Sequence, residues 1–170
     1  MVRNHLSTLE LTRIDEALNS LLLDVHKTYP EDSLLDIIKA AIPGMEILEE
    51  DFDPSIRGVI YKKSKEFPTP RIVIQKQLSP EQKTYALAHE FGHYLLDHPG
   101  EKNFMLDKMV YDGSRRQQLE AQAQYFAASL LMPRDKFLWM TRVIPNDEVI
   151  AKRFGVTPTT VKVRRAWLRV

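Results

Sequence analysis

Hydrophobic residues at the start of the chain recur at helical spacing. Within residues 5–29, leucine, isoleucine and valine return every three or four positions, which predicts an amphipathic helix that ends at Pro30. A shorter helix is predicted for residues 33–41, because apolar positions cluster there just before Pro43 and Gly44. The chain is therefore expected to open with two helices.

Short β-prone runs follow these helices. They occupy residues 45–48, 58–61 and 71–74, and each is rich in β-branched or other apolar side chains. Turn-prone stretches at residues 53–55 and 65–70 separate the runs. This alternation predicts a small sheet of about three strands.

The second half of the chain has helical patterning. A capping serine, a proline at the first helical position and a glutamine three residues after the serine stand together at 79–82. They predict the start of a helix that runs to about residue 97. Further helices are predicted after a loop, at residues 114–131 with Ser114 as the cap, and at 147–154 and 158–168. The predicted fold class is α+β and mostly helical.

Composition limits the kinds of site that the chain can contain. The 170 residues are 44% hydrophobic and 28% charged and include no cysteine, as in one globular domain or one domain with a small appendage. Any metal must then be held by histidine and carboxylate. No signal-like or membrane-length apolar segment is present in the sequence, so we expect a cytoplasmic protein without a membrane partner.

The most informative segment is His89-Glu90-Phe91-Gly92-His93. Histidines at positions i and i+4 lie on one face of a helix, so His89 and His93 can bind a single zinc ion. Glu90 is rotated by about 100° about the helix axis from His89, so it lies beside the ion and does not bind it. From there it can act as a general base that takes a proton from the zinc-bound water of a peptidase. Gly92 is a poor helix former, which indicates that another group approaches closely at this point.

A third protein ligand is needed to leave one coordination position open for water. Glu120 is one candidate, since it lies on a predicted helix rich in alanine that can pack closely against the histidine helix. His98, five residues after His93, is another. The remaining alternatives are carboxylates of the predicted loop, namely Glu101, Asp107 and Asp112.

Other aromatic and basic residues have less defined roles. His5 and His26 are interpreted as ordinary helix-face or surface histidines, and Trp139 and Trp167 as packing residues. An oxyanion formed during peptide hydrolysis needs a hydrogen-bond donor, and the sequence offers several without choosing among them. They are Tyr85, Tyr111, Arg115 and Arg116.

Residues 85–96 and 120–133, together with the C-terminal segment, resemble the ImmA/IrrE family of metallopeptidases. The resemblance implies a zincin-like core, a zinc-dependent peptidase activity with one zinc per chain, and Glu120 as the third ligand beside His89 and His93. It also implies a protein substrate, typically a helix-turn-helix repressor, and a compact phage- or mobile-element type of protein. One departure is Asp97, with His98 beside it, where the family often has a histidine.

The C-terminal segment is basic and resembles a helix-turn-helix. Residues 151–170 contain six basic and no acidic side chains. We therefore divide the chain into a peptidase domain at 1–145 and a helix-turn-helix-like segment at 146–170, packed on that domain or continuous with it. The second helix would project Thr159, Thr160, Lys162 and Arg165. An alternative function is accordingly a DNA-binding transcriptional regulator whose peptidase core is ancillary or inactive.

Overall fold

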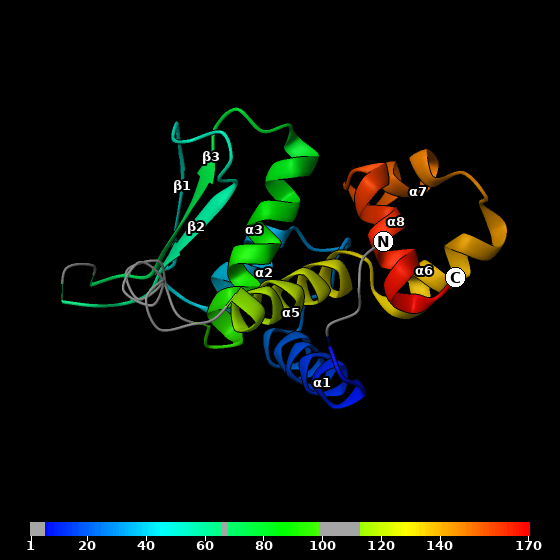
Figure 1. Ribbon diagram of the computed structural model, residues 1–170, viewed down its shortest axis with the longest axis horizontal. Helices are drawn as coiled ribbons and strands as arrows, with labels where there is room; N and C mark the ends of the chain where they lie inside the picture. Colours follow the sequence, from blue (N-terminus) through cyan, green and yellow to red (C-terminus); the bar gives the residue numbers. More distant parts are fainter. Residues whose placement is uncertain (1–5, 66–67, 99–112) are drawn as a thin grey trace.

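The computed structural model describes residues 6–65, 68–98 and 113–170, and helices flank a small sheet there (Figure 1). The elements are α1 (Thr8–Val25), α2 (Leu34–Ala41), β1 (Glu46–Glu50), β2 (Gly58–Tyr61), β3 (Arg71–Gln75), α3 (Pro80–Leu95), α5 (Gly113–Leu131), α6 (Arg134–Val143), α7 (Asp147–Phe154) and α8 (Pro158–Leu168). The predicted α+β, mostly helical class is confirmed. In this part of the chain no helix has both the length and the apolarity to cross a bilayer.

The sheet has three strands in the order β1-β3-β2. The central strand β3 pairs in parallel with β1 and antiparallel with β2, so Val73 stands opposite Leu48 on one side and Val59 on the other. Its side chains Ile72, Val73 and Ile74 are buried. Within the described residues β2 is an edge strand, and helix α3 packs against both β2 and β3.

Helices α3 and α5 cross in close contact at the centre of the molecule (Figure 1). A Cβ atom built on Gly92 of α3 would lie 2.9 Å from Cδ1 of Phe126 on α5, closer than such atoms approach. Phe126 and the neighbouring Ala123 and Ala127 are completely buried. The close neighbour that the sequence indicated at Gly92 is therefore an aromatic side chain of the partner helix.

Helix α1 packs on α5 through an apolar face and a polar contact. Ile14 and Leu18 are buried in the common core. The hydroxyl of Tyr125 on α5 donates to the carboxylate of Asp15 on α1, at 3.0 and 2.9 Å from its two oxygens. The N-terminal helix is thus held against the same helix that contacts α3.

The C-terminal helices α7 and α8 lie on the opposite side of α3 and α5 from the sheet (Figure 1). The hydroxyl of Tyr29 donates to the carbonyl of Phe154 over 2.7 Å. The buried guanidinium of Arg164 donates from Nε to the Met132 carbonyl at 3.0 Å and from Nη1 to Ser129 Oγ at 2.8 Å. These buried polar contacts attach the basic segment to the core.

The structure differs from the sequence prediction around Pro133. We expected the chain to leave helical structure there, whereas Pro133 occupies the cap position of the additional helix α6. Trp139 of this helix is 61% exposed, so its predicted packing role is wrong, while Trp167 is buried as expected. Helix α5 begins at Gly113, so Ser114 lies within the helix and not before it.

The contact between Gly92 and Phe126 predicts that Gly92→Ala destabilises the protein. Overpacking a filled core costs about 1–3 kcal/mol, and the gain from replacing a helical glycine by alanine offsets about 1 kcal/mol of this cost. We expect the free energy of unfolding, measured by denaturant titration, to fall by up to about 2 kcal/mol. An increase would mean that helix propensity outweighs the contact.

Candidate metal centre

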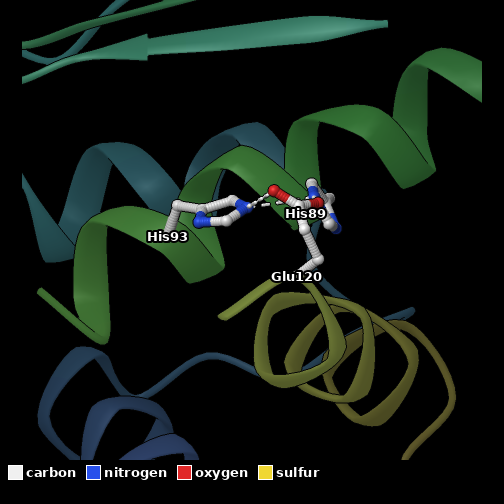
Figure 2. A group of neighbouring side chains, drawn as sticks. All are labelled: His89, His93 and Glu120. Atoms are coloured by element: carbon white, nitrogen blue, oxygen red, sulfur yellow. Dashed lines mark hydrogen bonds and ion pairs between the residues drawn. The ribbon is translucent and has the colours of Figure 1, made fainter. Parts of the chain in front are cut away.

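His89, His93 and Glu120 bring their ligand atoms together between α3 and α5 (Figure 2). The Nε2 atoms of His89 and His93 are 3.1 Å apart. Glu120 Oε2 lies 3.2 Å from Nε2 of His89, and its Oε1 lies 3.6 Å from Nε2 of His93. The helix pair therefore presents two imidazoles and a carboxylate to one point.

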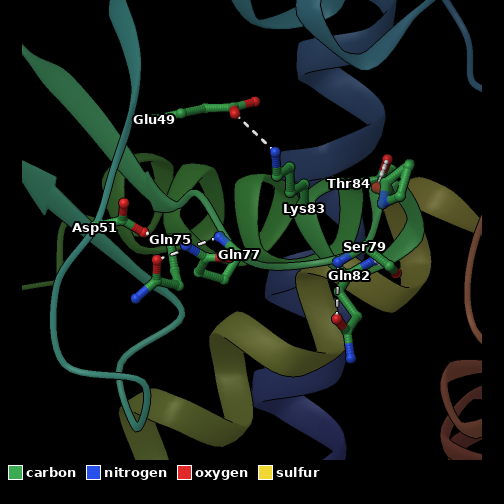
Figure 3. Close-up of polar contacts among 9 residues, drawn as sticks. Glu49, Asp51, Gln75, Gln77, Ser79, Gln82, Lys83 and Thr84 are labelled. Carbon is green, nitrogen blue, oxygen red and sulfur yellow. Dashed lines mark hydrogen bonds and ion pairs between the residues drawn. The ribbon is translucent and has the colours of Figure 1, made fainter.

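A capping box and an ion pair hold the start of α3. Ser79 Oγ accepts from the Gln82 backbone N–H at 3.3 Å, and the Gln82 side chain accepts from the Ser79 backbone N–H at 3.0 Å (Figure 3). This is the capping box that the sequence predicted. Lys83 adds a 2.7 Å ion pair to Glu49 of β1, which ties the first turn of α3 to the sheet.

The separations between the three ligand atoms fit a tetrahedral zinc ion. Bonds of about 2.0–2.1 Å at tetrahedral angles separate two ligand atoms by about 3.3–3.5 Å. The observed separations of 3.1, 3.2 and 3.6 Å lie around this value. Two imidazoles and one carboxylate are also a donor set that zinc takes with one position left open.

The electrostatics of the cluster keep Glu120 ionised. Burial raises the pKa of its carboxyl, but the close contacts with the imidazoles of His89 and His93 outweigh this effect and hold the pKa well below the usual range. A negatively charged oxygen ligand is thus available at neutral pH. It would partly balance the charge of a divalent cation at this position.

Glu90 lies beside this cluster and not within it. Its side chain is buried on α3 and lines the same groove as His89 and His93. A Cβ atom on Gly58 of β2 would lie 2.8 Å from Cγ and 3.1 Å from Oε1 of Glu90. The glycine in the edge strand therefore makes room for the Glu90 carboxylate.

His98 contacts His93 on the side away from the cluster. The Nδ1 atoms of the two rings are 2.9 Å apart, and Nε2 of His98 lies 2.8 Å from Oε1 of Gln122. Burial, followed by the nearby His93, lowers the pKa of His98 to about 4, so its ring is neutral at pH 7. Of the third-ligand candidates among the described residues, only Glu120 joins the histidine pair.

The remaining candidates from the sequence analysis are divided between the groove and the residues that the structure does not describe. The loop carboxylates Glu101, Asp107 and Asp112 and the oxyanion candidate Tyr111 lie outside the described residues. Tyr85 and Arg116 line the groove at the cluster.

The groove in front of the cluster has a volume of about 1030 Å³. Residues 55–60, α3 and α5 line the groove, and α8 with its N-cap contributes Thr157, Thr159, Thr160 and Val163. The sequence analysis assigned Thr159 and Thr160 to a DNA-reading helix and did not identify residues 55–60. Local patterns give no signal for such walls, since the segments meet only through tertiary packing.

The family model of Peptidase M78, described as the IrrE N-terminal-like domain, matches residues 40–165. The chain belongs to this family. The match includes the histidine pair, Glu90 and Glu120, and the resemblance seen in the sequence is confirmed. It also gives the chain the fold of a metallopeptidase family.

Among solved structures, a Mycobacterium tuberculosis transcriptional regulator has a similar fold, with a TM-score of 0.62 at 18% sequence identity. The similarity covers 91% of this chain and 55% of that chain, so the M78 chain spans about half the length of the regulator. No curated protein matches the chain.

The ligand geometry predicts that Glu120 is needed for metal retention. We expect about one zinc ion per wild-type chain after reconstitution. In Glu120→Ala we expect the zinc affinity to fall by more than about 100-fold, which is more than the loss of a residue that only hydrogen-bonds to a ligand would cause. Elemental analysis with a chelator competition measures both. Glu148→Ala, an exposed carboxylate of α7, is the control that should retain the metal. Equal retention by Glu120→Ala would contradict the assignment.

Proposed function

We propose that the chain is a zinc-dependent endopeptidase that cleaves a helix-turn-helix repressor or another regulatory protein. The observation that carries this proposal is the convergence of His89, His93 and Glu120 beside Glu90 in one groove. Membership of the M78 family supports a peptidase reaction. The repressor as substrate is suggested by the resemblance to the ImmA/IrrE family.

In the proposed reaction, His89, His93 and Glu120 would hold a zinc ion, which would supply Lewis acidity toward water and the scissile carbonyl. Glu90 accepts a proton from the attacking water on a carboxylate oxygen. It then delivers this proton to the nitrogen of the leaving amine. The packing of Glu90 against Gly58 limits the movement of the carboxylate between these two steps.

An extended protein segment is the substrate shape that the groove favours. Strand β2 borders the groove through Gly58, Val59 and Ile60, and in the described residues its one strand partner is β3. An edge strand offers backbone N–H and C=O groups to a peptide that adds alongside it. Such pairing would lay the substrate backbone across the metal cluster.

Tyr85 is the donor that we propose for the developing oxyanion. It lies one helical turn before His89, with the two rings stacked at 6.4 Å between centroids. Burial raises the pKa of Tyr85 to about 12, so the hydroxyl keeps its proton at neutral pH and can donate a hydrogen bond. Arg116, which also lines the groove, provides a cationic side chain on the opposite helix.

The alternative function, a DNA-binding regulator, has less support from the C-terminal segment. Of the side chains that a DNA-reading helix would project, Thr160 is buried and Arg165 forms a 2.9 Å ion pair with Asp147. Thr159 lines the metal groove, which leaves Lys162 as an exposed cation of this set. One exposed lysine on the helix that would read DNA gives a weak electrostatic footprint for phosphate contacts, and the other exposed cations of the segment, Lys152, Arg153 and Arg169, do not belong to this set.

Replacing Glu90 by glutamine should separate metal binding from catalysis. Glu90→Gln keeps the size of the side chain but cannot accept the proton, so we expect normal zinc content and a cleavage rate lower by about 100-fold or more. Cleavage is measured by mass spectrometry on a proteome-derived peptide library, which samples many candidate substrates at once.

Glu81→Gln is the matched control, since it makes the same chemical change on an exposed residue of the same helix. It should cleave the library like the wild type. A Glu90→Gln variant with wild-type cleavage would refute the role of Glu90 as the base. A zinc-loaded wild type that cleaves neither the library nor any added repressor would refute the peptidase.

For the C-terminal segment we expect no saturable binding of a mixed-sequence DNA duplex below about 1 μM at physiological salt. Fluorescence anisotropy over a series of salt concentrations measures this. Tighter binding with a steep salt dependence would instead favour the DNA-binding regulator, because phosphate contacts release counterions.

A further inference from the structure

A line of hydrogen bonds runs from the N-terminal helix to the metal cluster. Glu10 Oε1 on α1 accepts from Nε2 of Gln122 on α5 at 3.0 Å. Oε1 of the same amide faces Nε2 of His98 at 2.8 Å, and Nδ1 of His98 faces Nδ1 of His93 at 2.9 Å. Four side chains from three segments thus form one connected path.

The carboxylate of Glu10 gives this path its direction. It receives Ser7 N–H and Ser7 Oγ–H on Oε2, at 2.8 and 2.7 Å, and the amides of Gln118 and Gln122 on Oε1, at 2.5 and 3.0 Å. An ionised carboxylate only accepts hydrogen bonds. The NH₂ group of Gln122 must therefore point at Glu10, since a flipped amide would bring two acceptors together.

The same reasoning continues from Gln122 to the histidines. Because the amide oxygen faces His98, Nε2 of His98 carries the proton, and a neutral imidazole then has a bare Nδ1. That bare nitrogen accepts, so Nδ1 of His93 is the donor across the 2.9 Å contact. His93 is left with a lone pair on Nε2, the atom that lies 3.6 Å from Glu120 Oε1.

We propose that Glu10, Gln122 and His98 are positioning residues that hold His93 in the tautomer able to bind the metal through Nε2. The inference rests on the proposed zinc site. A ligating histidine whose second nitrogen donates to a fixed acceptor is locked in ring orientation and is a stronger ligand. His93 has such an acceptor, whereas the buried Nδ1 of His89 has no hydrogen-bond partner within the described residues.

The path also gives α1 a role that the family match does not contain. The match covers residues 40–165, and α1 spans Thr8–Val25, so Glu10 comes from outside it. Glu10 is held at the start of α1 by the capping box with Ser7. The orientation of a metal ligand in the family core therefore depends on a helix cap more than 80 residues away in sequence.

The tautomer of His98 is the direct test. In zinc-loaded wild type, ¹⁵N NMR of the imidazoles should show His98 protonated at Nε2 and bare at Nδ1. In Glu10→Gln the second amide can present either group to Gln122, so the His98 signals should shift toward a mixture of tautomers. A wild-type His98 with its proton on Nδ1 would overturn the proposal.

Zinc affinity, measured by chelator competition, is the second readout. We expect His98→Phe to weaken zinc binding by about 10–100-fold, and Glu10→Gln by about tenfold. One control acts on the same helix without entering the path. Asp15→Asn removes a carboxylate that contacts Tyr125 but leaves Glu10, Gln122 and His98 in place. It should bind zinc within about twofold of wild type, because outer partners of the ligand are unchanged.

The outcomes separate this inference from the proposed function. If the wild type binds zinc tightly and both His98→Phe and Glu10→Gln bind it as tightly as the wild type, the proposed path is overturned while the proposed function stands. The same would follow if Glu10→Gln and Asp15→Asn weakened zinc equally, since the effect would then be loss of α1 packing. No zinc binding by wild type would overturn the proposed function and the inference together.

Discussion

The close approach of α3 and α5 is the constraint on which the rest of the structure depends. Glycine at position 92 allows the backbone of α3 to rest on Phe126, and Ala123 and Ala127 keep the facing side of α5 thin. Glu120 projects from the same helix one to two turns earlier, and only a short separation lets its carboxylate reach within 3.2 Å of His89. Since a binding geometry fails when its groups are displaced by more than about 0.5 Å, the packing of an aromatic ring sets the chemistry of the cluster.

Burying two imidazoles against a carboxylate has an electrostatic cost that the fold offsets in several ways. Glu120 contacts both imidazoles, and these contacts lower its pKa against the opposing effect of burial. His93 is supported from behind by His98, whose second nitrogen reaches the Gln122 amide. Buried polar groups are tolerated when they find partners. The partners behind His93 come from α1, α5 and the residues just after α3, whereas Nδ1 of His89 has no partner within the described residues. The cluster is therefore a property of the helix assembly and not of the five-residue motif alone.

The parts of this arrangement that sequence could predict are those with local causes. The capping box at Ser79 and the spacing of His89 and His93 each involve residues within one or two helical turns of one another, so the local sequence predicts them. Helix α6 escapes prediction because Pro133 suggests a stop, although proline is also tolerated at a helix start. The contact between Gln122 and Glu10 joins residues 112 positions apart, and no local pattern carries such information. The α8 wall of the groove escapes prediction for the same reason.

The basic C-terminal segment has a structural role that its charge composition does not reveal. Arg164 is almost completely buried, donates to the Met132 carbonyl and Ser129 Oγ at the end of α5, and lies over the Tyr125 ring at 5.8 Å. An arginine removed from water is retained only where such hydrogen bonds are complete. Its contacts attach α8 to the C-terminal end of α5, and the attached helix lines the metal groove with its N-cap Thr157 and with Thr160 of its first turn. One of the basic residues that suggested a nucleic-acid partner thus holds in place a helix that lines the groove. The shape of the groove therefore depends on how the C-terminal helices pack.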